Sequence, residues 1–179
     1  MDQFRSFDQL RTGELSVIRH GFFRPWFELT DGQFSYGKFS YANLWKTSSI
    51  LAAAHNTWII KRKGVFSRSL LIHDTNDMEI GTITPELWSP KIMLSMNDGF
   101  EAVYLKKKVF TRTFTLTNTQ YGDMMNFKTE LLGFKTPFKV SVDLNQLKNV
   151  PNLPLLALLG INLILLKQER AAASAGVGG

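Results

Sequence analysis

The sequence predicts a mainly β fold, in which a closed antiparallel barrel of about twelve strands encloses a hydrophobic C-terminal helix. Three observations lead to this prediction. Short runs of aromatic and β-branched residues alternate with turn signals along most of the chain. A strand pattern recurs about every 44 residues. One long apolar run, residues 153–166, stands near the C-terminal end.

The composition is that of one globular domain. The chain has 179 residues, of which 44% are hydrophobic and 20% are charged, and this excludes a disordered chain and a polytopic membrane protein. We divide it into an N-terminal segment (1–14), a single barrel domain (15–170) with a central helix at about 153–167, and a flexible tail (171–179) of small residues.

The N-terminal residues contain four charges and no apolar run of the kind found in signal peptides. We therefore expect no targeting segment and a cytoplasmic protein, peripheral to a membrane if it contacts one. The absence of cysteine excludes disulfides, cysteine-ligated zinc, iron–sulfur clusters and thiol catalysis. A formal net charge of +6 favours anionic partners.

Turn signals divide the body of the chain into strands. Glycine accepts the positive φ of tight hairpins, which predicts turns at Asp31-Gly32, Lys63-Gly64, Asp98-Gly99 and Tyr121-Gly122-Asp123. Residues 48–55 fit either a helical turn or a connecting strand. Two prolines predict a loop over residues 84–90. Residues 74–79 are rich in oxygen ligands but lack the glycine and final glutamate of a calcium loop, so we predict a hairpin turn.

An internal repeat supports the closed barrel. Residues 59–74 read IIKRKGVFSRSLLIHD and residues 104–118 read YLKKKVFTRTFTLTN, and a weaker copy begins at Gly21-Phe22-Phe23. Three such units with four strands each give about twelve strands, and closing the sheet removes its exposed edges. The alternative is that the similarity is only that of any two hairpins.

The apolar run predicts the filling of this barrel. Residues 153–166 are shorter than the roughly 20 residues that span a bilayer, and they are apolar on all sides, as in a buried helix. Pro154 fits the first helical turn. Gly160 predicts a close approach to a strand, and Asn162 then needs a buried partner. The alternative is a membrane anchor over residues 149–166, flanked by lysines.

These segments resemble the tubby C-terminal-like superfamily, which includes tubby proteins, phospholipid scramblases and LURP-one-related proteins. The resemblance is carried by WIIKRKGVFSRSLLIHDTNDMEIGTI, VYLKKKVFTRTFTLTNTQYGDMM and PNLPLLALLGINLILL, and it covers roughly residues 15–166. It implies a twelve-stranded barrel around a central helix, together with phosphoinositide binding, lipid movement or membrane-linked signalling. No calcium-binding or phosphoinositide-binding motif of the family can be matched residue by residue.

Two cation triplets are the first candidates for binding an anionic partner. Each precedes a Val-Phe pair at a predicted hairpin tip, so charge and apolar surface could meet a membrane together. Near an anionic membrane each cation contributes on the order of 1 kcal/mol. The alternative is that they are solvated hairpin ends that protect strand edges and solubility. The triplets are Lys61, Arg62 and Lys63, and Lys106, Lys107 and Lys108.

Two arginines are the second candidates. Strand alternation places Arg68 and Arg112 on apolar, inward faces, where an unpaired charge is costly and an anion would stabilise it. This predicts a phosphate or carboxylate site at a barrel mouth. The alternatives are an internal acidic partner, a strand-end arginine reaching outward, or a β-bulge that changes the parity.

No catalytic motif is present, and His20, His55 and His73 are too scattered for a metal pair. The sequence therefore predicts a non-enzymatic module without cofactor or metal, which binds anionic phospholipid or a phosphorylated partner at a membrane surface. One alternative is a scaffold or regulatory protein without lipid contact. Nucleic-acid binding is a further alternative, supported only by a pI near 9.6 and by aromatics between cations.

Overall fold

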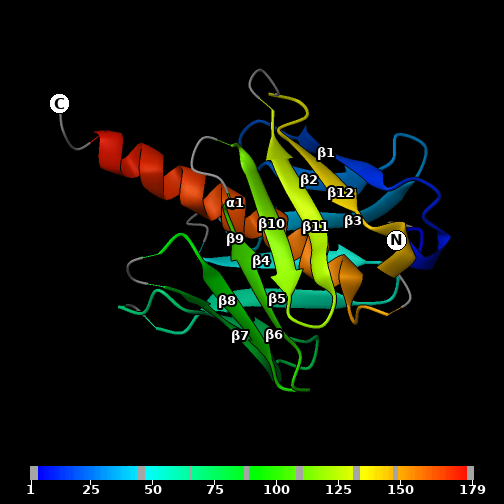
Figure 1. Ribbon diagram of the computed structural model, residues 1–179. Helices are drawn as coiled ribbons and strands as arrows, with labels where there is room; N and C mark the ends of the chain where they lie inside the picture. The colour runs from blue at the N-terminus through cyan, green and yellow to red at the C-terminus, as the bar shows by residue number, and fades with distance from the viewer. Residues whose placement is uncertain are drawn as a thin grey trace.

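The computed structural model describes residues 4–43, 47–64, 66–86, 89–107, 111–130, 134–146 and 149–176. Within these residues, twelve antiparallel strands form a closed barrel, and a single α-helix follows them (Figure 1). The predicted fold class is therefore confirmed.

The strands are short and follow one another around the barrel. Single 3-10 turns stand before β1, at Phe7–Gln9, and after β12, at Leu144–Gln146. The elements are β1 (Glu14–His20), β2 (Trp26–Thr30), β3 (Ser35–Tyr41), β4 (Ser48–Ala53), β5 (Thr57–Arg62), β6 (Leu70–His73), β7 (Glu79–Pro85), β8 (Ile92–Met96), β9 (Glu101–Leu105), β10 (Thr113–Asn118), β11 (Gly122–Thr129), β12 (Phe138–Val142) and α1 (Leu153–Gly176).

Every strand pairs with its neighbours in the sequence, and β1 closes the ring on β12 with Val17 opposite Phe138. Because all pairs are antiparallel, successive loops alternate between the two ends of the barrel. The loops that follow odd-numbered strands lie at one end, and the loops that follow even-numbered strands lie at the other. This alternation decides which loops can act together.

The barrel wall separates its two faces by strand alternation. In β12, Phe138, Val140 and Val142 are buried, whereas Lys139 and Ser141 between them are exposed. The inward residues of a twelve-stranded ring cannot fill its interior alone, because barrel diameter grows with strand number and about eight strands already leave just enough room for side chains.

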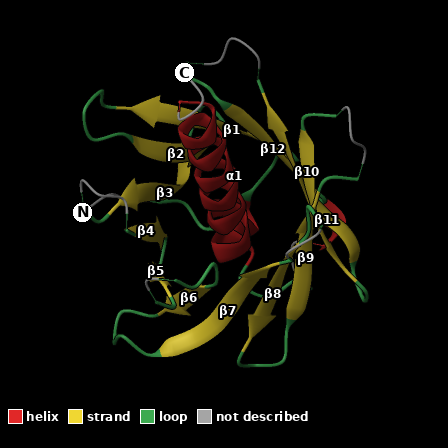
Figure 2. Ribbon diagram, turned by 90° about the vertical axis from the view of Figure 1, so that its left-hand side faces the viewer, coloured by secondary structure: helices red, strands yellow, loops and turns green. Residues whose placement is uncertain are grey.

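Helix α1 fills the remaining space (Figure 2). All residues from 155 to 164 are buried, which confirms the prediction of a central helix. Two features fix its position. The Tyr104 hydroxyl donates a hydrogen bond of 2.7 Å to the buried carbonyl of Leu156. Gly160 lies against the ring of Phe127, and a Cβ added at Gly160 would collide with this ring. The predicted close approach at Gly160 is confirmed.

Asn162 is the polar residue of the buried helix. Its side chain is fully buried, and Ser49 donates a hydrogen bond of 3.3 Å to its Oδ1 atom. The predicted buried partner is therefore present. Its Nδ2 atom has no hydrogen-bond partner within the described residues.

Among the described residues, no helix has the length and apolarity that a membrane span requires.

Several predicted boundaries were wrong. The helix continues to Gly176 and does not end near residue 167, in agreement with the high helix propensity of the alanines at 171–173. The barrel takes in part of the N-terminal segment, since β1 begins at Glu14, and Phe7 and Leu10 are buried in the core. Residues 48–53 form strand β4, which decides between the two alternatives there. Pro85 belongs to β7, so the loop predicted over residues 84–90 begins later.

Replacing Gly160 by alanine tests the contact between the helix and the wall. Alanine alone would favour a helix by about 1 kcal/mol, but overpacking against Phe127 costs about 1–3 kcal/mol, so we expect net destabilisation. The measurement is the urea midpoint of unfolding. The exposed substitution Gln168→Ala is the control and should leave this midpoint nearly unchanged. A higher midpoint for Gly160→Ala would contradict the tight packing.

Candidate functional site

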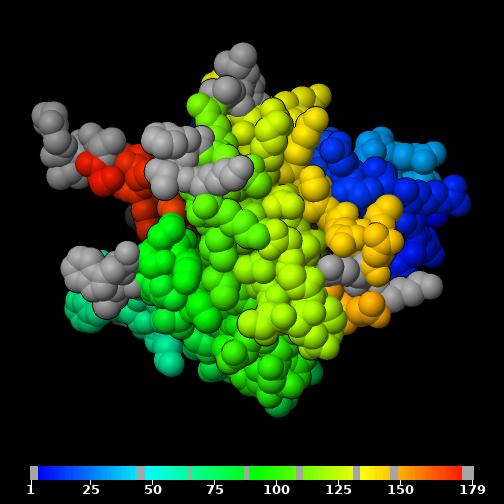
Figure 3. Space-filling model, in the orientation of Figure 1, coloured from blue at the N-terminus to red at the C-terminus, as the bar shows by residue number. Residues whose placement is uncertain are grey.

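The two ends of the barrel differ in what the helix does there. Helix α1 begins at one end, which we call the entry end, and emerges at the other, the exit end. Tyr41, the last residue of β3, donates a hydrogen bond of 2.9 Å to Glu169 as the helix leaves. Figure 3 shows the last described turns of α1 projecting from the barrel surface. The exit-end loops follow β1, β3, β5, β7, β9 and β11. Their described residues are 21–25, 42–43, 47, 63–64, 66–69, 86, 89–91, 106–107, 111–112, 130 and 134–137.

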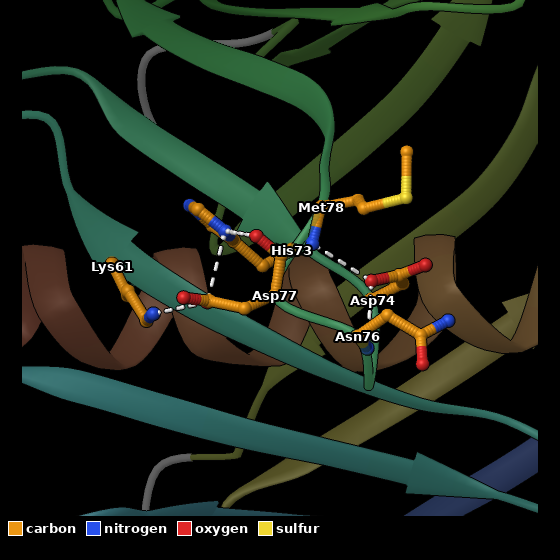
Figure 4. A network of polar contacts seen from close by, with 6 residues as sticks. All are labelled: Lys61, His73, Asp74, Asn76, Asp77 and Met78. Atoms are coloured by element: carbon orange, nitrogen blue, oxygen red, sulfur yellow. Dashed lines mark hydrogen bonds and ion pairs between the residues drawn. The ribbon is translucent and has the colours of Figure 1, made fainter.

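Aspartates in the entry-end loops have a structural task. Asp74 accepts hydrogen bonds of 2.9 Å from the backbone N–H groups of Asn76 and Met78, which confirms the predicted hairpin turn (Figure 4). Side chains of this kind stabilise tight turns by satisfying backbone donors. The entry-end loops therefore collect negative charge for reasons of folding. The other aspartates that accept backbone N–H groups there are Asp31, Asp98 and Asp143.

The exit-end loops instead collect positive charge. They contain most of the predicted candidates, and Arg62 is the last residue of β5 at the same end. The exit-end acids include Glu169, which accepts the Tyr41 hydrogen bond, and Glu130, which is 3.9 Å from Lys128. Lys108, also predicted, lies outside the described residues. The described candidates in these loops are Lys63, Arg68, Lys106, Lys107 and Arg112.

Two of the predicted cations have acidic partners. Lys61 pairs with Asp77, and Lys107 pairs with Asp123, each with a nitrogen-to-oxygen distance of 2.5 Å. Both pairs join residues sixteen positions apart. The two repeat segments align Lys61 with Lys106 and not with Lys107, so the pairs are similar but do not occupy equivalent repeat positions. Both ion pairs are solvent-exposed, so they contribute little to stability. They do, however, partly neutralise the charges of Lys61 and Lys107.

The prediction of inward, buried positions for Arg68 and Arg112 was wrong. Strand β6 begins at Leu70 and β10 at Thr113, so both arginines lie in loops and their side chains are exposed. Strand alternation does not determine side-chain burial beyond the end of a strand. Because both side chains are exposed, neither guanidinium group needs a buried counter-ion.

The structure brings several cations together around the emerging helix. Partial burial lowers the pKa of the Arg170 guanidinium, and the neighbouring charges of Arg62 and Arg68 lower it further. Partial burial likewise lowers the pKa of the Lys167 ammonium, with the charge of Lys106 as the second cause. The like charges nearby are the smaller cause of both pKa shifts. An anion bound among them would relieve this repulsion.

Four phenylalanines at the exit end are almost completely exposed. Phe22 and Phe23 are 82% and 90% exposed, Phe134 is 87% exposed, and Phe66 is 100% exposed. The loops of Phe22 and Phe134 are neighbours, because the backbone N–H of Arg19 donates a 2.7 Å hydrogen bond to the carbonyl of Lys135. Single exposed apolar residues are ordinary, but several at one end of a barrel mark an interaction surface.

Comparison with known proteins adds no relative. The chain matches no protein-family model, no curated protein and no solved structure. The resemblance to the tubby-like superfamily therefore stays a prediction, and the geometry of the exit end is what supports a function.

Sequence reasoning missed part of this surface. In the sequence, Phe22 and Phe23 belong only to the weak repeat copy, and no pattern marks Phe134. The order of the loops could have identified all three phenylalanines, because every loop that follows an odd-numbered strand lies at the same end of the barrel. Lys167 and Arg170 follow the apolar run at a spacing of three, which puts them on one helix face.

A titration of Asp77 tests the assignment of Lys61. Lys61 donates a hydrogen bond to the Asp77 carboxylate and its charge attracts it, so the pKa of Asp77 lies below its ordinary value. The substitution Lys61→Met removes both effects and should raise this pKa. Carbon NMR of the side-chain carboxyl measures the shift, and Lys107→Met should leave Asp77 unaffected. An unchanged titration in Lys61→Met would show that the pair does not form in solution.

Proposed function

We propose that this protein is a non-enzymatic module that attaches to anionic phospholipid membranes through its exit end. The observation that carries the proposal is the combination found there: four phenylalanines between 82% and 100% exposed, together with the cations Arg68, Lys91, Lys167 and Arg170, which lie around the emerging helix. Exposed aromatic area of this extent at one end of a protein is typical of an interaction surface.

The two kinds of side chain suit the two layers of a membrane surface. Fully burying one phenylalanine contributes about 1.5–3 kcal/mol, and each cation near anionic headgroups contributes about 1 kcal/mol. A few of each, acting together, are sufficient for reversible attachment. The aromatic rings would enter the interface between headgroups and acyl chains, while lysines and arginines stay at headgroup level.

The charge distribution supports one orientation. Aspartates lie in the entry-end loops and cations in the exit-end loops, so an anionic surface attracts one end and repels the other. The charge difference thus presents the exposed phenylalanines to the membrane. The resemblance to the tubby-like superfamily, with its implied link to lipids, points in the same direction.

Vesicle sedimentation tests the proposal. We expect binding to vesicles of phosphatidylcholine mixed equally with phosphatidylserine, and little binding to phosphatidylcholine alone. The substitution Phe66→Ser removes one fully exposed ring and should lower the partition coefficient about tenfold or more.

The substitution Met78→Ser is the matched control. Met78 is 64% exposed, but it lies in an entry-end loop, so its loss should leave vesicle binding unchanged. Equal and negligible binding to both kinds of vesicle would refute the proposal. Stronger retention by an oligonucleotide than by anionic vesicles would favour a nucleic-acid partner instead.

A further inference from the structure

A pocket opens beside the emerging helix at the exit end. It has a volume of about 160 Å³ and is formed by the loops before β6 and β8 and by the C-terminal half of α1. Its apolar lining includes Leu70, Ile92, Leu163 and Leu166. The cations that line it are Arg68, Lys91, Lys167 and Arg170.

Among the described residues, no acidic side chain lines the pocket. In the part of the chain that the structure describes, the side chains of Arg68, Lys91 and Arg170 form no hydrogen bond or ion pair. Lys167 lies over the ring of Phe114, with its nitrogen 4.7 Å from the ring centre. Among the described lining residues, four are cationic and none is acidic.

We propose that this pocket binds a phosphate monoester carried on an alkyl chain, with the phosphate among Arg68, Lys167 and Arg170 and the chain against the apolar lining. The site deepens the proposed function and rests on it, because a membrane supplies such amphiphiles at the end of the barrel that faces it. The ligand is then a lipid phosphate held by the protein, in addition to the general attraction of the surface.

The charge of the ligand follows from the number of cations. A phosphate monoester has a second pKa near 6 and so carries almost two negative charges at neutral pH. Guanidinium groups bind its oxygens in bidentate fashion, and two arginines line this pocket. A carboxylate or a phosphate diester carries a single charge and would neutralise fewer of the cations.

The apolar lining determines the rest of the ligand. Free phosphate would leave the leucine and isoleucine side chains in contact with water, whereas an alkyl chain would cover them. An apolar cavity of about 150 Å³ is known to hold a benzene molecule. The pocket is therefore large enough for a chain segment of about six carbons, with the phosphate at the rim.

A soluble probe without a membrane tests this site. We expect hexyl phosphate to bind the full chain at least tenfold more tightly than either inorganic phosphate or hexanol, as measured by calorimetry. Inorganic phosphate that binds as tightly as hexyl phosphate would overturn the lipid assignment in favour of a free phosphate. Absence of hexyl phosphate binding would overturn the site itself.

Charge variants locate the binding. The double variant Arg68→Gln with Arg170→Gln should weaken hexyl phosphate binding at least tenfold. The control is Arg11→Gln with Lys139→Gln, which changes the net charge equally at exposed residues outside the pocket. An equal loss in both double variants would overturn the site, because it would show only general attraction.

The two proposals can fail separately. Attachment of the wild type to anionic vesicles without hexyl phosphate binding would overturn the pocket and leave the proposed function standing. Hexyl phosphate binding without vesicle attachment would contradict the proposed function and its supply of ligand from a membrane.

Discussion

The burial of one apolar helix inside a closed sheet is the constraint on which the rest of this structure depends. The inward side chains of twelve strands leave space along the axis, and the residues from 155 to 164 occupy it. Tight contacts hold the helix in place, with Gly160 against Phe127 and Tyr104 bonded to the carbonyl of Leu156. Because the helix has a direction, the barrel gains two different ends.

This polarity organises the charge of the molecule. Aspartates at the entry end accept backbone N–H groups and so shape the hairpins. The cations at the exit end have few such tasks, apart from Lys61 and Lys107, which pair with aspartates. Surface residues that do not stabilise the fold are available to bind a partner. The emerging helix adds Lys167 and Arg170 to the same end of the barrel as the exposed phenylalanines.

The sequence allowed the architecture to be predicted because its signals are periodic and local. The repeat and the apolar run together predict the closed barrel with its central helix. Gly160 within that run also predicts the close approach to a strand. The residues at which strands and helices begin and end were harder to predict from the sequence. Strand β6 begins only at Leu70, so Arg68 lies in the loop before it. At the other end of the chain, alanines extend α1 to Gly176. The pairing of Lys61 with Asp77 and the grouping of Arg68 with Arg170 depend on how strands and helix meet in space. No spacing along the chain reveals such contacts.

Hydrogen exchange of the backbone amides in α1, in the presence and absence of anionic vesicles, tests the central claim most directly. If the helix permanently fills the barrel, the amides of residues 155–164 exchange slowly under both conditions, at rates close to those of global unfolding. Changes on adding vesicles would then be confined to the exit-end loops and the last turns of the helix. Fast exchange of residues 155–164 in free protein, or a large loss of their protection on vesicles, would contradict the account.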